Sequence, residues 1–154
     1  MCVFEVLVDT KTFPDTKAVR GDQLTSSQRE WLQKNVPLDP GEEIRWFYAG
    51  GMWSIEEDGQ YFTNRRVVTY ERDEAGKPQF LEALLEEVES IDEQPSTAWY
   101  EDTSITVATE YDVELPLLVS AEDKLDRKFI GELRECWQAA RNARPPINES
   151  DQSE

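Results

Sequence analysis

The sequence predicts an α+β protein that is mainly β, built as a small curved antiparallel sheet or barrel plugged by one helix. Three observations support this fold class. Short segments in which apolar and polar residues alternate recur through the middle of the chain. Turn sequences at 73–78 and 111–112 separate two pairs of these segments, as in β-hairpins. The segment 125–140 carries one apolar stripe at helical spacing.

Length and charge limit the classes of protein to consider. The chain has 154 residues, enough for one well-buried domain but not for two. It contains 33 acidic and 16 basic residues and no histidine, so its formal net charge is −17. Five Trp, five Tyr and six Phe supply the apolar area of a core, so the acidity does not indicate disorder. This charge repels phosphate groups, which excludes nucleic acid as an expected partner and disfavours anionic membranes.

The negative charge is concentrated in one part of the chain. Residues 42–114 include 19 acidic and 5 basic residues, which gives this segment a net charge of −14. Because the strand patterns lie in the same segment, the acidic surface is expected on a sheet. Two interpretations stay open: the charge serves solubility alone, or a cationic partner relieves the self-repulsion.

The two cysteines and the N-terminus indicate a cytoplasmic protein. Cys2 and Cys136 are too few for a disulfide scaffold, and both lie in apolar patterns that predict small core residues. The first residues have neither a basic start nor a long apolar stretch, so no signal peptide is expected. No apolar run is long enough to span a bilayer.

The N-terminal part of the chain predicts one strand and one short helix. Residues 2–8 are rich in β-branched side chains and suit a largely buried strand, and 9–24 form an extended loop. Thr25, Ser26 and Ser27 offer N-cap hydroxyls, with Glu30 placed to close a capping box on Ser27. The helix that follows must end before Pro37.

The central part predicts strands, with one ambiguous stretch. Residues 43–48 form a strand, 60–72 a long second strand, and 103–109 with 113–119 a hairpin. Residues 79–93 have apolar residues at helical spacing, and Glu and Leu favour a helix. The same residues also fit two short strands.

The last element is the clearest helix. Ser120 and Asp123 give a capping signal at its start. A proline pair ends it, and the tail at 145–154 is expected to be disordered. Its apolar stripe consists of Leu125, Phe129, Leu133, Cys136, Trp137 and Ala140.

Four segments, taken in order, resemble the bacterial pleckstrin-homology-like (PH/GRAM-like) domain family. VPLDPGEEI at 36–44 is similar to the entry to the first strand of these domains, and FTNRRVV at 62–68 to their Thr-Asn-x-Arg strand. LEEVESI at 85–91 is similar to a later strand, and 120–137 to the closing helix. The order and spacing agree over residues 36–140, about two thirds of the chain.

The resemblance implies a bent antiparallel barrel of about seven strands, capped by the C-terminal amphipathic helix. On this basis residues 36–144 form the domain and 79–93 are strands. Residues 1–35 lie outside the resemblance and are expected to be an N-terminal strand/helix extension packed on the domain. Such an extension either adds a strand to an exposed sheet edge or packs across one end.

The residues present indicate a protein without catalytic activity, cofactor or metal. The absence of histidine removes the most common general base and the His-based triads. Glu110, Asp112 and Glu114 gather around one turn, but no calcium-loop spacing is present and acids in turns are usually solvated.

Phosphoinositide binding, the best-known activity of the family, relies on basic residues in and beside the loop between the first two strands. Here that loop, 49–60, contains no Lys or Arg and three consecutive acids. An anionic headgroup or small ligand would have to be bound by Arg65, Arg66 and Lys77. The two arginines are expected to pair with acids within the protein instead.

The leading hypothesis is a non-enzymatic module that binds a basic protein through an acidic sheet surface. The expected contact residues are Trp53, Glu56, Glu57 and Asp58, because an exposed Trp surrounded by carboxylates suits a cationic partner. Alternatively, Trp53 closes the end of the barrel. An acidic immunity or inhibitor protein that blocks a cationic toxin or nuclease is a second alternative.

Overall fold

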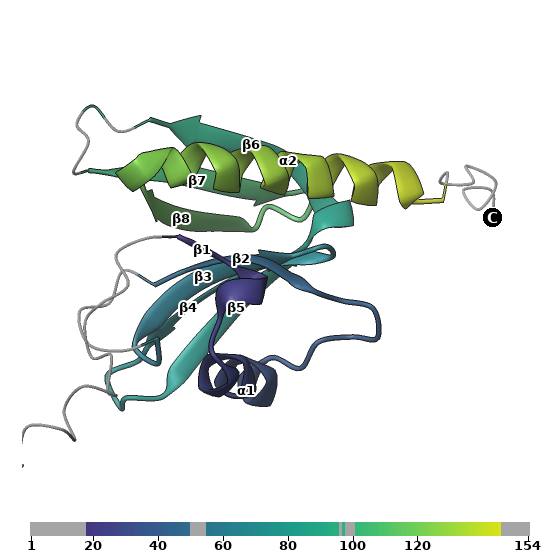
Figure 1. Cartoon of the computed structure of the whole chain (residues 1–154). Helices are drawn as coiled ribbons and strands as arrows, with labels where there is room; N and C mark the ends of the chain where they lie inside the picture. Colours follow the sequence, from purple (N-terminus) through teal and green to yellow (C-terminus); the bar gives the residue numbers. More distant parts are fainter. Residues whose placement is uncertain (1–17, 50–54, 96, 98–100, 146–154) are drawn as a thin grey trace, which may run out of the picture.

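The computed structural model describes residues 18–49, 55–95, 97 and 101–145 (Figure 1). The predicted strand at 2–8, together with Cys2, Trp53 and the predicted tail beyond 145, lies outside the described residues. The elements are β1 (Val19–Arg20), a 3₁₀ turn (Gly21–Gln23), α1 (Ser26–Asn35), β2 (Ile44–Tyr48), β3 (Asp58–Thr63), β4 (Arg66–Arg72), β5 (Pro78–Leu84), a second 3₁₀ turn (Leu85–Glu87), β6 (Val88–Gln94), β7 (Asp102–Thr109), β8 (Glu114–Ser120), a third 3₁₀ turn (Glu122–Lys124) and α2 (Leu125–Ala143).

Two antiparallel sheets and two helices form the described structure. One sheet has five strands in the order β1-β2-β3-β4-β5, and the other has three in the order β6-β7-β8. In Figure 1, α2 runs along the three-stranded sheet, and α1 lies on the far side of the five-stranded sheet. The mainly β fold with a closing C-terminal helix is therefore confirmed, and β2 to β8 are the seven strands that the resemblance implies.

The larger core lies between the two sheets and is closed by α2. Phe129 of α2 is fully buried and meets Phe62 of β3 edge to face, with ring centroids 4.9 Å apart. Leu133 and Cys136 are buried one and two turns further on, as the apolar stripe predicted. Thr103 of β7 donates a 2.7 Å hydrogen bond to the buried carboxylate of Asp126, which fixes the first turn of α2 to the sheet.

A second core lies on the other face of the five-stranded sheet, under α1. Because neighbouring residues of a strand face opposite sides, Trp46 enters the larger core and Phe47 enters the second one. Tyr61, Val68 and Leu32 are also buried there. The strands β2, β3 and β4 therefore bury apolar residues on both faces.

A β-bulge in β2 alters the expected alternation. The pairing with β3 shifts between Ile44 and Trp46, so the two side chains face different cores although they are two residues apart. The simple alternation through residues 43–48 would have placed both on one face.

Residues 79–93 are strands, as the resemblance implied and contrary to their local helical propensity. β5 pairs with β4 and β6 pairs with β7 along nearly their whole lengths. A single 3₁₀ turn, Leu85–Glu87, separates them and buries Leu85 in the larger core. Pairing between strands and burial of alternate residues outweigh the intrinsic preference of Glu and Leu.

The predicted long strand at 60–72 is wrong, because a tight turn at Asn64 and Arg65 divides it into β3 and β4. At α1 one of the three N-cap candidates is confirmed, but the predicted capping box between Ser27 and Glu30 is wrong. Thr25 is the N-cap, and its hydroxyl and backbone N–H form a reciprocal box with Gln28, at 3.2 and 2.8 Å. Ser27 and Glu30 lie inside the helix.

The predicted start of the last helix is early. Ser120 accepts a 3.2 Å hydrogen bond from the backbone N–H of Glu122, which starts the third 3₁₀ turn rather than α2. Asp123 and Lys124 then adopt positive φ angles of 53° and 58°, so the regular helix begins only at Leu125.

The N-terminal residues that the structure describes add to the five-stranded sheet. β1 pairs antiparallel with β2 at its edge. Glu132 of α2 contacts both strands. Its carboxylate accepts a hydrogen bond of 2.7 Å from the indole N–H of Trp46 in β2 and one of 3.3 Å from Arg20 in β1. Arg45 of β2 lies 3.3 Å from the other carboxylate oxygen.

Candidate acidic site and its surroundings

The predicted acidic residues lie at one end of the five-stranded sheet. Glu56 and Glu57 end the segment between β2 and β3, and Asp58 is the first residue of β3. In the β3–β4 register Asp58 stands directly opposite Glu71, which places two carboxylates side by side. One carboxylate oxygen of Asp58 is buried without a hydrogen-bond partner among the described atoms.

A carboxylate from the other sheet joins this end near the hydroxyl of Tyr48. The Tyr48 hydroxyl lies 3.4 Å from the carboxylate of Asp102, at the start of β7. Burial raises the pKa of Tyr48 to about 12, with further contributions from the charges of Asp102, Asp58 and Glu122. We refer to Glu56, Glu57, Asp58, Glu71, Asp102 and Glu122 as the acidic end.

One arginine lies among these acids and is engaged. Arg72 donates to the backbone carbonyl of Glu56 at 2.7 Å and pairs with its carboxylate at 3.2 Å. Tyr70 also donates to the backbone at Ile55, at 2.6 Å, so two bonds fasten the segment before β3 to β4. Burial raises the pKa of Tyr70, as do the nearby Tyr61 and the charges of Asp58 and Glu56.

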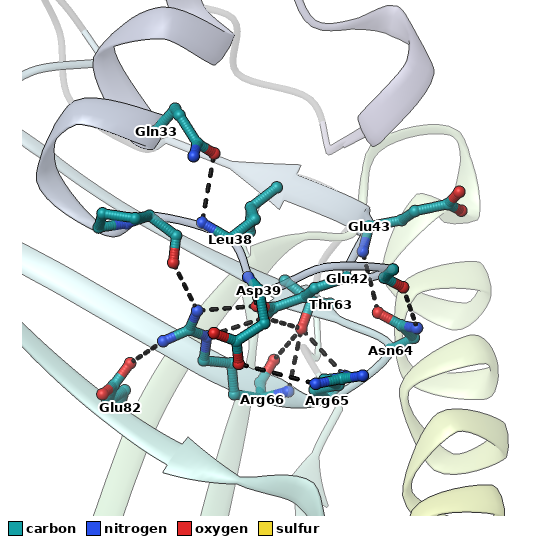
Figure 2. A network of polar contacts seen from close by, with 12 residues as sticks. Gln33, Leu38, Asp39, Glu42, Glu43, Thr63, Asn64, Arg65, Arg66 and Glu82 are labelled. Atoms are coloured by element: carbon teal, nitrogen blue, oxygen red, sulfur yellow. Dashed lines mark hydrogen bonds and ion pairs between the residues drawn. The ribbon is translucent and has the colours of Figure 1, made fainter.

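Arg66, an alternative ligand-binding residue, is instead the centre of a buried polar network (Figure 2). Its guanidinium contacts both carboxylate oxygens of Glu42 at 2.8 Å, Glu82 at 2.8 Å and the backbone carbonyl of Pro37 at 2.8 Å. The Glu42 side chain is fully buried. It also accepts a 2.7 Å hydrogen bond from Thr63 and one of 2.8 Å from the backbone N–H of Asp39.

This network holds Glu42 in its ionised form. Burial alone raises the pKa of Glu42, but the hydrogen bonds from Arg66, Asp39 and Thr63 outweigh it and keep that pKa below its ordinary value. The hydrogen bonds of Arg66 to Glu42 and Glu82 raise the pKa of Arg66. The pair therefore joins the segment before β2 to the β3–β4 turn as a fixed charged contact.

The three predicted basic residues do not converge. Arg65 lies in the turn before β4, 3.7 Å from Asp39 and 3.3 Å from the backbone carbonyl of Pro40. Lys77 lies in the turn after β4. The seven-residue strand between them separates the two turns by roughly 20 Å, more than a single headgroup spans.

The structure also contains a groove that sequence reasoning missed. It has a volume of about 780 Å³ and lies between the first 3₁₀ turn, α1 and the segment that leads into β2. Leu32, Val36 and Ile44 supply apolar lining, and Glu42 contributes to one wall. No sequence motif marked this groove, because its walls come from three separate segments.

In the described part of the chain, no group of three His, Cys, Asp or Glu side chains could hold a metal. Cys136 is a buried free thiol, as predicted, and burial raises its pKa. Among the described helices, none combines the length and apolar character that crossing a bilayer requires.

Comparison with solved structures identifies the fold. The chain is similar to a DUF1696 family protein with a pleckstrin-homology domain from Shewanella loihica, with a TM-score of 0.51 and 13% identity over 81% of this chain and 96% of that one. It is also similar to a PH-domain-containing protein from Exiguobacterium sibiricum, with a TM-score of 0.53 and 14% identity over 82% of this chain. This match spans 62% of the Exiguobacterium protein.

No protein-family model and no curated protein matches the sequence. The structural matches show that the fold is that of bacterial pleckstrin-homology domains, as the sequence resemblance implied.

Proposed function

We propose that the protein is a non-enzymatic interaction module that binds a basic protein partner through its acidic end. The observations that carry this proposal are the pairing of Asp58 with Glu71 across β3 and β4 and the position of Asp102, from the other sheet, 3.4 Å from the hydroxyl of Tyr48. Arg72, the arginine among them, is already bonded to Glu56. A cationic surface that docks here relieves repulsion between these carboxylates.

The same geometry weakens the anionic-ligand alternative. Arg66 is bonded on several sides by protein groups, and Arg65 and Lys77 lie at opposite ends of β4. A phosphate that recruits Arg66 would have to displace the buried carboxylate of Glu42, which would then lack its partner. We therefore expect no sedimentation of the protein with phosphoinositide-containing liposomes.

Charge reversal tests the proposal. The variant Glu57→Lys with Glu71→Lys changes two side chains of the acidic end for which no ion pair is described. The control variant, Glu30→Lys with Glu135→Lys, makes the same change of charge on exposed positions of α1 and α2. The tagged wild type is used to capture its partner from the native cell. The control variant should capture as much of that protein as the wild type does, and the acidic-end variant about tenfold less.

Two outcomes would refute the proposal. One is equal loss of capture in both variants, which would mean that only net charge matters. The other is sedimentation with the liposomes that is abolished by Arg65→Ala, which would favour the anionic-ligand alternative. Circular dichroism of each variant establishes that the fold is retained.

A further inference from the structure

The open edges of the two sheets differ in how they are protected. A sheet edge exposes unpaired backbone N–H and C=O groups, which can pair with another strand. At the edge of β6, α2 covers the backbone: Trp137 donates to the carbonyl of Val88 at 2.9 Å and Arg134 to that of Ile91 at 3.4 Å. Because these side chains occupy backbone groups of β6, an added strand cannot pair with this edge.

The edge of β8 is protected in two other ways. The side-chain amide of Gln60 bonds both the N–H of Leu118, at 2.7 Å, and its carbonyl, so it substitutes for a neighbouring strand. Pro116 has no N–H to offer. β1 is only two residues long and presents little edge.

β5 is the long edge strand that lacks such protection within the described part of the chain. Backbone bonds from Leu85 to Arg65 at 2.8 Å and from Asp73 to Lys77 at 2.9 Å fix which of its residues face β4. In an antiparallel pair these bonds alternate, so the N–H and C=O groups of Phe80, Glu82 and Leu84 point away from the sheet. By the same alternation, the N–H and C=O groups of Leu118 in β8 point away from β7, and the N–H donates to the side chain of Gln60.

The side chains along this edge are accessible as well. Leu81 is 46% exposed and Leu84 is 40% exposed, and both are among the few exposed large apolar residues that the structure describes. Glu82 shares a face of the strand with Leu84, and Leu81 lies on the opposite face. The Glu82 side chain is 52% exposed and pairs with Arg66 through one carboxylate oxygen at 2.8 Å. The edge therefore presents outward backbone groups, two leucines and a carboxylate.

We infer that β5 accepts an extended segment of the basic partner as an added strand, in which apolar and basic residues alternate. Apolar side chains of that segment contact Leu81 on one face, and its Lys or Arg side chains lie beside Glu82 on the other face. A second copy of the chain does not fit this edge, because each copy carries a net charge of −17. The inference rests on the proposed function, since it requires a cationic partner.

A synthetic peptide of about eight residues with alternating Lys and Val, the length of a typical strand, tests the inference on the full chain. Its matched probe has the same sequence with alternate backbone amides N-methylated, which keeps the charge and removes the strand hydrogen bonds. The wild type should bind the methylated probe about tenfold or more weakly, because several backbone bonds are lost. Amide exchange at Phe80, Glu82 and Leu84 should slow when the unmethylated peptide is bound.

Two substitutions at one position separate backbone pairing from charge. Glu82→Pro removes an outward N–H that β4 does not use, and proline is tolerated at such edge positions. Glu82→Gln keeps the N–H and removes the charge. We expect the proline variant to lose about tenfold in affinity for the peptide and the glutamine variant only about two- to threefold.

Three results would overturn the inference: no peptide binding at low salt, equal binding of the two probes, or unchanged exchange at the three edge amides. Each leaves the proposed function standing if capture is still lost in the Glu57→Lys, Glu71→Lys variant. Capture that survives this variant refutes the proposed function whatever the peptide does. If Glu82→Pro fails to fold, the difference in affinity of the wild type for the unmethylated and methylated peptides still tests the inference.

Discussion

Arg66→Ala should destabilise the protein by about 3–5 kcal/mol, because it leaves the buried carboxylate of Glu42 without its charged partner. The change in the free energy of unfolding can be measured by urea denaturation at neutral pH. Arg65→Ala is the matched control, since Arg65 is half exposed and makes only long contacts; its effect should stay within about 0.5 kcal/mol. Similar small effects for both arginines would contradict the network described here.

The effect of Arg66→Ala should also depend on pH. In the wild type the pKa of Glu42 lies below its ordinary value of 4.5, so its stabilising contribution is present above that pH and is lost as the pH falls below it. In Arg66→Ala, burial is expected to raise the pKa of Glu42 instead. The difference in stability between the two proteins should then narrow between about pH 7 and pH 4, as Glu42 takes up a proton in the variant. Adding Glu42→Gln to Arg66→Ala should recover part of the lost stability at neutral pH.

Phe129→Ala should cost about 3–5 kcal/mol, because it removes a fully buried ring from the centre of the larger core. That ring meets Phe62 edge to face at 4.9 Å and lies 6.4 Å from Trp46. The predicted result is a lower denaturation midpoint with little change in the dependence on urea.

The control for this prediction is Glu135→Ala on the exposed face of the same helix, which should change stability by about 0.5 kcal/mol or less. A small effect of Phe129→Ala would mean that α2 does not close the barrel. The test is independent of any partner.

Much of the fold could be predicted from the sequence, because burial leaves periodic signals. The stripe on α2 follows from the spacing of Leu125 to Ala140, and the hairpin at 111–112 from its turn residues. The strands at 79–93 could not be predicted locally. Their conformation depends on pairing with β4 and β7, which are distant in sequence, and only the family resemblance indicated it.

The candidate site was predictable only in part. Glu56, Glu57 and Asp58 are adjacent in sequence, but the contributions of Glu71, Asp102 and Glu122 arise from strand register and from the packing of two sheets. The pairing of Arg66 with Glu42 had no local signal, because 24 positions separate them. Sequence reasoning expected these arginines to pair within the protein but did not identify Glu42, Glu82 or Asp39 as the partners.

The salt dependence of the association rate tests most directly the central claim, that the acidic end attracts a basic partner. The rate constant for binding the captured partner would be measured by stopped flow from about 0.05 to 0.5 M salt, a range over which screening becomes strong. We predict that the rate constant falls steeply with salt for the wild type and for the double variant Glu30→Lys with Glu135→Lys. For Glu57→Lys with Glu71→Lys the rate constant should be lower and should depend less on salt. A wild-type rate that does not change with salt, or one that both variants reduce equally, would contradict the account.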